Sequence, residues 1–439
     1  MINQLLFAIA LIITLGVFAF TAWRYIRLFK LTQPAFPVRD FGKRFGLMMR
    51  VAFGQAKMFR RPIVGFIHAL VFWGFLVILV GSIEMVIDGL FGIERSLNVM
   101  GWFYNFLMAT GDIFALIIAV AIIIFLSRRL FMHVKRFEGI EMKHISHIDA
   151  NVALTIIFLL MVSLLGMNAA YVAHGTAVKA HIHGVFPVSE YIALAFGSLS
   201  VESMHLFHEI FWWSHILLIF VFANILPYSK HFHVFMSVPN VFLSRLEPLG
   251  KLPTMDSVTR EVKLMMNPET AFAAAPADAP VERFGVLDAE DASWKNYLDA
   301  LACTECGRCT EVCPANITGK KLSPRKVMMD LRARMKEKRD GLLKQGKEYS
   351  DGKSLVRDYI SEEELWACTT CNACAQECPI NIDHPKLIVD MRRYLVMEEG
   401  SAPGELKAMF SNIENNGAPW QYSPDDRLVW ADDLEMNKV

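Results

Sequence analysis

The chain has 439 residues, of which 54% are hydrophobic, and its 44 Lys and Arg balance 44 Asp and Glu. Zero net charge gives no sign of a nucleic-acid partner, and the hydrophobic fraction is too high for an ordinary soluble protein. Long uncharged runs lie within residues 1–235, whereas residues 240–439 are rich in charge and contain all eight cysteines. The composition therefore predicts a membrane half followed by a soluble half.

Five segments are apolar and long enough to cross a bilayer as helices, which takes about 20 residues. They are residues 1–23, 63–83, 96–127, 151–178 and 210–229. No basic residue precedes the first run, and Arg24, Arg27 and Lys30 follow it. This order favours a retained anchor over a cleaved signal peptide. We therefore expect an all-α bundle of five spans.

The connecting loops predict the orientation of this bundle. Residues 24–62 hold ten Lys and Arg and one acid, and residues 128–150 add five basic residues, while the opposite loops offer only Arg95 and Lys179. Because positive charge stays on the cytoplasmic side, we expect the amino terminus outside and the soluble half in the cytoplasm. The predicted location is the cytoplasmic (inner) membrane of a prokaryote.

Two histidines are expected at one depth near the cytoplasmic side. His68 lies roughly 8 Å into the second span, and His233 directly follows the fifth apolar run. Imidazoles at equal depth on two helices can hold a haem iron between them. His215 precedes His233 by about 27 Å if the helix is continuous, which places it in the outer half. A hydrogen-bonded helix contact is the alternative role for an intramembrane histidine.

The stretch from His215 through Pro227-Tyr-Ser-Lys to His233 resembles the last helix of the cytochrome b subunit of respiratory nitrate reductase. The resemblance implies that His68 and His233 bind a haem b nearer the cytoplasm and that His215 serves an outer haem. The family has a second histidine ten residues after His68, where this chain has Ile78. The partner of His215 stays open among Met108, Asp112 and His174, and so does the second haem.

After the spans, residues 268–282 hold prolines and alanines without a hydrophobic period, which predicts an extended linker. Helices are expected at 290–302 and from Ser323 onward, with Ser323 as N-cap and Pro324 in the first turn. Residues 360–367 lead into the second cysteine run, and a closing helix is expected at 385–396.

All eight cysteines fall in two frames of the form C-x-x-C-x-x-C-x-x-x-C-P. In such pairs the fourth cysteine of each run binds the cluster of the other run. One predicted [4Fe–4S] cluster is therefore bound by Cys303, Cys306, Cys309 and Cys378. The other is bound by Cys368, Cys371, Cys374 and Cys313. Zinc sites and disulfide frameworks do not follow this spacing, so the frames predict an electron-transfer protein.

This α-helical, two-cluster segment resembles the dicluster subunit of heterodisulfide reductase, and similar units occur in succinate and anaerobic glycerol-3-phosphate dehydrogenases. Membrane-bound heterodisulfide reductases also have a cytochrome b of the nitrate reductase type, so the whole chain resembles a fusion of the two. The expected parts are a cytochrome b-like membrane domain (1–235), a linker (236–289), a dicluster domain (290–400) and an acidic, aromatic tail (401–439).

Substrate chemistry is expected on another polypeptide. The clusters use every cysteine, and no Gly-rich phosphate loop follows a strand, so the sequence predicts no flavin or nicotinamide fold. The resemblances imply a cytoplasmic catalytic partner, which is either a protein with cysteine-rich repeats or a flavoprotein. The tail carries Trp420, Tyr422 and Trp430 among acids, which favours either a docking segment or disorder.

We expect an oxidoreductase subunit that passes electrons between this partner and membrane quinone. The quinone site is predicted near His215, bounded by Glu84 and Asp112, because buried carboxylates can relay protons. The alternative site lies by the basic loop of residues 39–61. The alternative function is an energy-coupling or ion-translocating component with regulatory or structural clusters, although the spans show no transporter-like inverted repeat.

Overall fold

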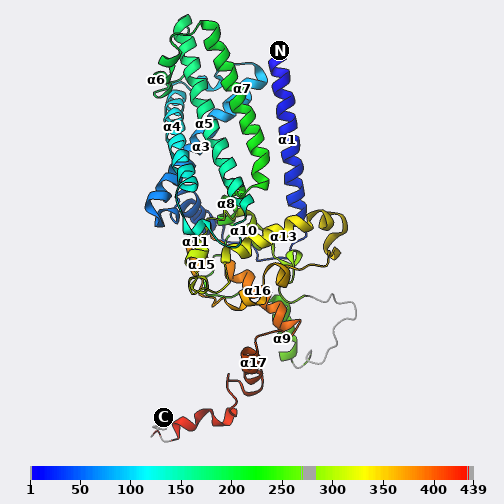
Figure 1. Ribbon diagram of the computed structural model, residues 1–439. Helices are drawn as coiled ribbons and strands as arrows, with labels where there is room; N and C mark the ends of the chain where they lie inside the picture. Colours follow the sequence, from blue (N-terminus) through cyan, green and yellow to red (C-terminus); the bar gives the residue numbers. More distant parts are fainter. Residues whose placement is uncertain (1, 268, 270–282, 433, 435–439) are drawn as a thin grey trace. The chain divides into compact units, whose positions relative to one another are not determined.

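The computed structural model describes residues 2–267, 269, 283–432 and 434, and every regular element among these residues is a helix (Figure 1). The predicted all-α class is therefore confirmed for the described part of the chain. The linker predicted at 268–282 lies, apart from Glu269, outside the described residues, as do Asp433 and Glu435 of the predicted acidic tail.

Five helices are long and apolar enough to span a membrane, as the sequence predicted. They are α1 (Ile2–Phe29), α3 (Pro62–Phe91), α4 (Trp102–Leu130), α5 (His144–Val178) and α7 (Val201–Ile225). Figure 1 shows them side by side, with α5 packed against α4 and α7, and α3 packed against α4. Many large apolar side chains, such as Ile12, Ile63 and Phe106, stay exposed on the bundle. Such a surface suits lipid, and the chain is a membrane-associated protein.

Two span boundaries differ from the predicted ones for local reasons. Residues Ser96–Met100 form a separate 3-10 turn, and the chain then turns at Gly101, whose φ of 58° favours glycine. Helix α4 therefore begins at Trp102 instead of residue 96. Helix α7 begins earlier than predicted, at Val201, because the side chain of Ser200 caps it.

The assumption of one continuous helix from His215 to His233 is wrong. Helix α7 ends at Ile225, Leu226–Tyr228 and Lys230–Phe232 are separate 3-10 turns, and His233 begins α8 (His233–Phe242). Pro227 lacks the N–H that an α-helix would need at its position. The separation of about 27 Å derived from helical rise therefore does not apply to this pair.

The cysteine-containing segment consists of helices joined by short turns. They are α10 (Trp294–Ala302), α11 (Arg308–Glu311), α12 (Pro314–Ile317), α13 (Pro324–Gln345), α14 (Glu362–Trp366), α15 (Ala373–Glu377) and α16 (His384–Met397). The longest of them, α13, packs against α10 and α11. Ser323 accepts a hydrogen bond from the Lys326 amide, and Pro324 is the first residue of α13. The predicted cap of this helix is therefore confirmed.

This segment packs against the end of the membrane bundle that lies opposite the N-terminus (Figure 1). Arg27 at the end of α1 donates to the carbonyl oxygen of Leu343 at 2.8 Å. Arg325, 1% exposed, pairs with Glu141 at 2.8 Å. Lys230 pairs with Glu305 at 3.2 Å. Residues 1–253 and 288–386 accordingly form one compact unit.

Residues 254–287 and 387–439 form a second compact unit. It contains α9 (Asp256–Met266), α17 (Gly404–Asn416) and a 3-10 helix at Pro424–Ala431. The amide of Val286 donates to the carbonyl oxygen of Asp390 at 3.0 Å. The described part of the tail contains these two helical segments, and Trp420 and Trp430 are exposed there.

Candidate functional site

The two cysteine runs adopt the same backbone conformation. In each run the second residue after the first cysteine has a left-handed φ, 57° at Glu305 and 53° at Thr370. The residue after the second cysteine also has a left-handed φ, which is 75° at Gly307 and 61° at Asn372. A Cβ on Gly307 would lie 2.5 Å from the carbonyl oxygen of Arg136, so the close loop approach requires glycine there.

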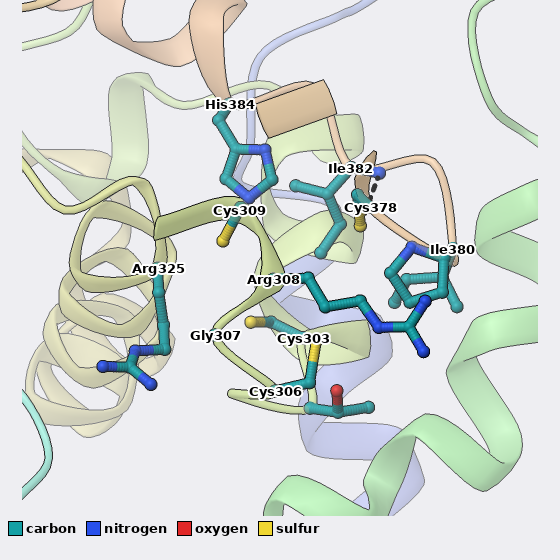
Figure 2. Close-up of a pocket in the computed structure, with 12 residues that line it drawn as sticks. Cys303, Cys306, Gly307, Arg308, Cys309, Arg325, Cys378, Ile380, Ile382 and His384 are labelled. Carbon is teal, nitrogen blue, oxygen red and sulfur yellow. Dashed lines mark hydrogen bonds between the residues drawn. The ribbon is translucent and has the colours of Figure 1, made fainter. Parts of the chain in front are cut away.

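Cysteines of both runs meet at one cavity. Figure 2 shows Cys378 together with the three leading cysteines of the first run around this space. The lining cysteines are Cys303, Cys306, Cys309 and Cys378. The structure therefore brings together the four residues predicted to hold one cluster.

The remaining cysteines form the second group. The largest charge effects on the Cys374 thiol come from Cys368, Cys313 and Cys371, so Cys313 of the first run lies near the second run. Cys313 and Cys374 are buried, while Cys371 is exposed. Within the described residues, no three His, Cys, Asp or Glu side chains converge as ligands of a single metal ion. A four-iron cubane instead gives each thiolate its own iron.

The thiols lie in an environment that suits iron binding. The amide of Thr370 donates to Cys368 Sγ, and that of Ile382 to Cys378 Sγ, both at 3.4 Å. Burial raises the pKa of the Cys303 thiol to about 11 and that of Cys378 to about 12. Iron must therefore displace protons from these sites when it binds. Amide donors aimed at sulfur are suited to the thiolates that result.

Basic side chains surround the first group, and the sequence alone did not indicate a role for them. Lys57 Nζ donates to the carbonyl oxygen of Cys378 at 3.1 Å, and Arg332 donates to that of Cys303 at 2.8 Å. Arg308, 2% exposed, lines the cavity and donates to the carbonyl oxygen of Lys57 at 3.1 Å. The only sequence signal was the position of Arg308 inside the first run.

His68 on α3 and His233 at the start of α8 lie within electrostatic range of each other. His233 Nδ1 donates to the carbonyl oxygen of Lys230 at 3.2 Å, so Nε2 is the ring nitrogen with a free lone pair. His68 Nδ1 is buried and has no hydrogen-bond partner in the described part of the chain. An oriented, neutral imidazole beside a second one fits axial ligation of haem iron. Arg308 acts electrostatically on His68 as well, so the first cysteine group and the histidine pair are neighbours.

His215, 2% exposed, has its Nδ1 at 3.0 Å from both Ser163 Oγ and the carbonyl oxygen of Leu160 on α5. The three candidate partners for an outer haem have other contacts. Met108 Sδ lies 3.8 Å from Arg95, and the ring of His174 lies 5.5 Å from that of His205. Among the described residues, none of the candidates bonds to His215.

The two carboxylates of the predicted quinone site hold the loops at the far end of the bundle. Asp112 accepts from the amides of Val188 and Ser189 at 2.8 and 2.9 Å and from Ser189 Oγ at 2.5 Å, so it caps α6 (Ser189–Ala193). Glu84 accepts from the Leu97 amide at 3.0 Å and from Tyr104 at 3.1 Å. Both groups therefore have structural contacts in addition to any role with protons.

Comparisons with known proteins agree with the cysteine geometry. A family model described as "4Fe-4S dicluster domain" matches residues 302–382. The chain is 29% identical to "EtfAB:quinone oxidoreductase" of Syntrophomonas wolfei, over 98% of this chain and 60% of that protein. It is 30% identical to "Probable iron-sulfur-binding oxidoreductase FadF" of Bacillus subtilis, over 98% of this chain and 61% of that protein.

Part of the chain has a further relative in the methanogens. Over 102 residues it is 32% identical to one subunit of the ferredoxin/F(420)H(2)-dependent CoB-CoM heterodisulfide reductase of Methanosarcina acetivorans, which is 23% of this chain and 49% of that protein. The chain spans about three-fifths of the length of the two oxidoreductases above. No solved structure matches.

These findings confirm an iron–sulfur electron-transfer protein with a 4Fe-4S dicluster domain and with oxidoreductases as relatives. The resemblance to heterodisulfide reductase is confirmed for the soluble half. The likeness of the membrane half to the nitrate reductase cytochrome stays a prediction, and so do the individual ligands.

Proposed function

We propose that this chain passes electrons between a cytoplasmic catalytic partner and membrane quinone. Cys303, Cys306, Cys309 and Cys378 would hold one [4Fe–4S] cluster, and Cys313, Cys368, Cys371 and Cys374 would hold the other. His68 and His233 would hold haem b. These groups supply one-electron carriers when bound, and quinone takes two electrons and two protons to become quinol.

The observation that carries this proposal is the position of Arg308. Its side chain lines the cavity of the first cysteine group and also acts on the charge of His68. A residue that lines one site and lies near the other supports a short path for electrons between them. The printed name of the Syntrophomonas relative, which includes quinone, supports the choice of the membrane substrate.

The partner is proposed to carry the substrate chemistry. The methanogen relative is named as one part of a larger heterodisulfide reductase, which favours a complex with other polypeptides. The two classes of partner are a protein with cysteine-rich repeats and a flavoprotein. The soluble half would meet this partner in the cytoplasm, as the positive loops predict.

The haem proposal is tested with the full chain purified in mild detergent. Wild-type protein is expected to contain about eight irons per chain in clusters and a low-spin haem b. His68→Ala and His233→Ala should each remove the Soret band and leave cluster iron unchanged, because the cysteines lie on other elements. His231→Ala is the matched control, since His231 bonds to Ser229 beside the site. Full Soret bands in both test variants would refute the ligand pair.

The quinone is proposed to react in the half of the membrane that faces away from the clusters, near His215 and between Glu84 and Asp112. Glu84→Gln and Asp112→Asn should slow quinol-driven haem reduction. Because Asp112 also caps α6, thermal stability is measured on the same samples. Unchanged reduction rates in both variants would move the site to the basic loop near His68.

A further inference from the structure

The two cysteine runs are a repeat, and two of the aligned positions at which they differ lie at the cavity of the first group. The runs read Cys-Gly-Arg-Cys at 306–309 and Cys-Asn-Ala-Cys at 371–374, so Arg308 corresponds to Ala373. Six residues after the fourth cysteine of each run, His384 corresponds to Gly319. Arg308 and His384 both line the cavity of the first group, and they are 2% and 1% exposed.

His384 presents its imidazole ring to this cavity. Its Nδ1 is buried, and the backbone of Ile382 acts on the ring. Figure 2 shows the ring among the lining residues, with its other nitrogen, Nε2, toward Cys309. A sulfur atom in the cavity would give an N–H of this ring an acceptor.

Arg308 brings a permanent positive charge to the same cavity, since a guanidinium stays protonated. Arg332 also donates to the carbonyl oxygen of Cys303, but it is paired with the carboxylate of Glu305 and therefore adds little net charge. At the second group, the largest charge effects on Cys374 are those of other cysteine thiols. Ala373 and Gly319 offer neither a charge nor a side-chain N–H there.

Reduction adds negative charge to a cluster, so nearby positive charge and hydrogen bonds to sulfur raise its potential. Burial of the first group acts in the opposite direction, because low dielectric disfavours added charge. The same low dielectric strengthens the attraction of the guanidinium. With the Arg308 guanidinium enclosed at this cavity and an imidazole N–H beside it, the attraction is expected to exceed the burial effect.

We propose that Arg308 and His384 hold the reduction potential at the Cys303, Cys306, Cys309 and Cys378 site above that at the Cys371 site. An electron donated by a reduced redox protein at the exposed Cys371 edge would then pass downhill toward His68. One electron leaves the second site for each electron that the first site gains, and no bond changes. This inference rests on the proposed function, which supplies the two clusters.

The test is an EPR-monitored redox titration of the full chain in detergent. Wild-type protein should show two separate midpoint potentials, and Cys371→Ser should perturb the signal with the lower one. Arg308→Ala and His384→Leu should each lower the higher midpoint and leave the other unchanged. Arg308→Lys and His384→Gln keep a charge and an N–H donor respectively, so they should restore most of the wild-type value. Lys321→Gln, which changes an exposed lysine, should shift neither midpoint.

The outcomes separate this inference from the proposed function. Two clusters with equal potentials, or variants that shift both midpoints alike, would overturn the inference while the electron-transfer function stands. Loss of either cluster in Arg308→Lys and His384→Gln as well would assign these residues to folding and also overturn it. Wild-type protein with fewer than two clusters would instead defeat the proposed function.

Discussion

Lys336 on α13 shows how one buried charge affects the docking of the soluble half. Its Nζ donates to the carbonyl oxygen of Tyr228 at 3.1 Å. Burial lowers the pKa of Lys336 to about 8, and Arg332 adds to this effect. The unfolded chain keeps the ordinary lysine value of about 10.4. Between these values the unfolded state binds more protons, so the free energy of unfolding rises with pH.

Lys336→Met should therefore stabilise the chain at pH 7, and this advantage should shrink steadily as the pH rises above about 8. The expected gain at pH 7 is on the order of 2 kcal/mol after allowance for partial solvent exposure. The measurement is the melting temperature between pH 6.5 and 9.5, as the difference between variant and wild type. Lys344→Met, near the exposed end of α13, is the control. Parallel pH profiles for Lys336→Met and wild type would contradict the role of burial.

The crossed cysteine pairing makes a second prediction at this scale. Cys378→Ser should change the same EPR signal as Cys303→Ser, although the two residues lie in different runs. Cys313→Ser should change the same signal as Cys371→Ser. The physical reason is the shared cavity, which joins Cys378 to the first run. If Cys378→Ser instead matches Cys371→Ser, each run binds its own cluster and the pairing is wrong.

At the scale of elements, the five spans and the α13 cap were predictable because hydropathy and capping are local properties. The boundaries at Gly101 and Ile225 were not, since they depend on turns that interrupt apolar sequence. The meeting of the two cysteine runs followed from spacing alone. The partners of Arg308 and Lys57 could not be predicted, because contacts between distant loops leave no periodic signal.

The buried pair of Arg325 and Glu141 joins α13 to the loop after α4. Glu141 also accepts from Ser323 Oγ at 2.6 Å. Glu141→Gln leaves the buried guanidinium without its counter-charge, which typically costs about 3–5 kcal/mol. Chemical unfolding of wild type, Glu141→Gln, Arg325→Met and the double variant would give the coupling energy.

The exposed pair of Lys321 and Glu363, at 2.6 Å, serves as the matched control for this cycle. Its removal should change stability by less than about 1 kcal/mol, because solvent screens exposed pairs. Equal effects for the buried and exposed pairs would show that the Arg325 contact does not hold the two halves together.

For the whole molecule, the order of a membrane half and a cluster domain was predictable from composition and cysteine spacing. The difference between the two cluster sites was not, because it depends on which cavity Arg308 and His384 enter. The role of the tail could not be predicted either, because it depends on contacts with a partner protein. Its exposed Trp420 and Trp430 have the character of contact residues.

Truncation after Gly400 should leave both clusters in place, since every cysteine precedes that point. Copurification of the catalytic partner should weaken, because the exposed aromatic residues are lost. Iron content and quantitative mass spectrometry of the purified complex measure the two effects. Trp420→Ser with Trp430→Ser tests the same surface without deletion. An undiminished complex in both cases would remove the tail from the interface.

The most direct measurement of the central claim is anaerobic reoxidation of the reduced full chain by a soluble naphthoquinone. The protein is reduced with dithionite, separated from it, and mixed with the quinone while cluster and haem absorbance are followed. Two one-electron clusters can supply the two electrons that one quinone needs. Wild type and His231→Ala should reoxidise their clusters rapidly, and His68→Ala should do so much more slowly with both clusters intact. Equal cluster reoxidation in wild type and His68→Ala would contradict an electron path through the histidine pair.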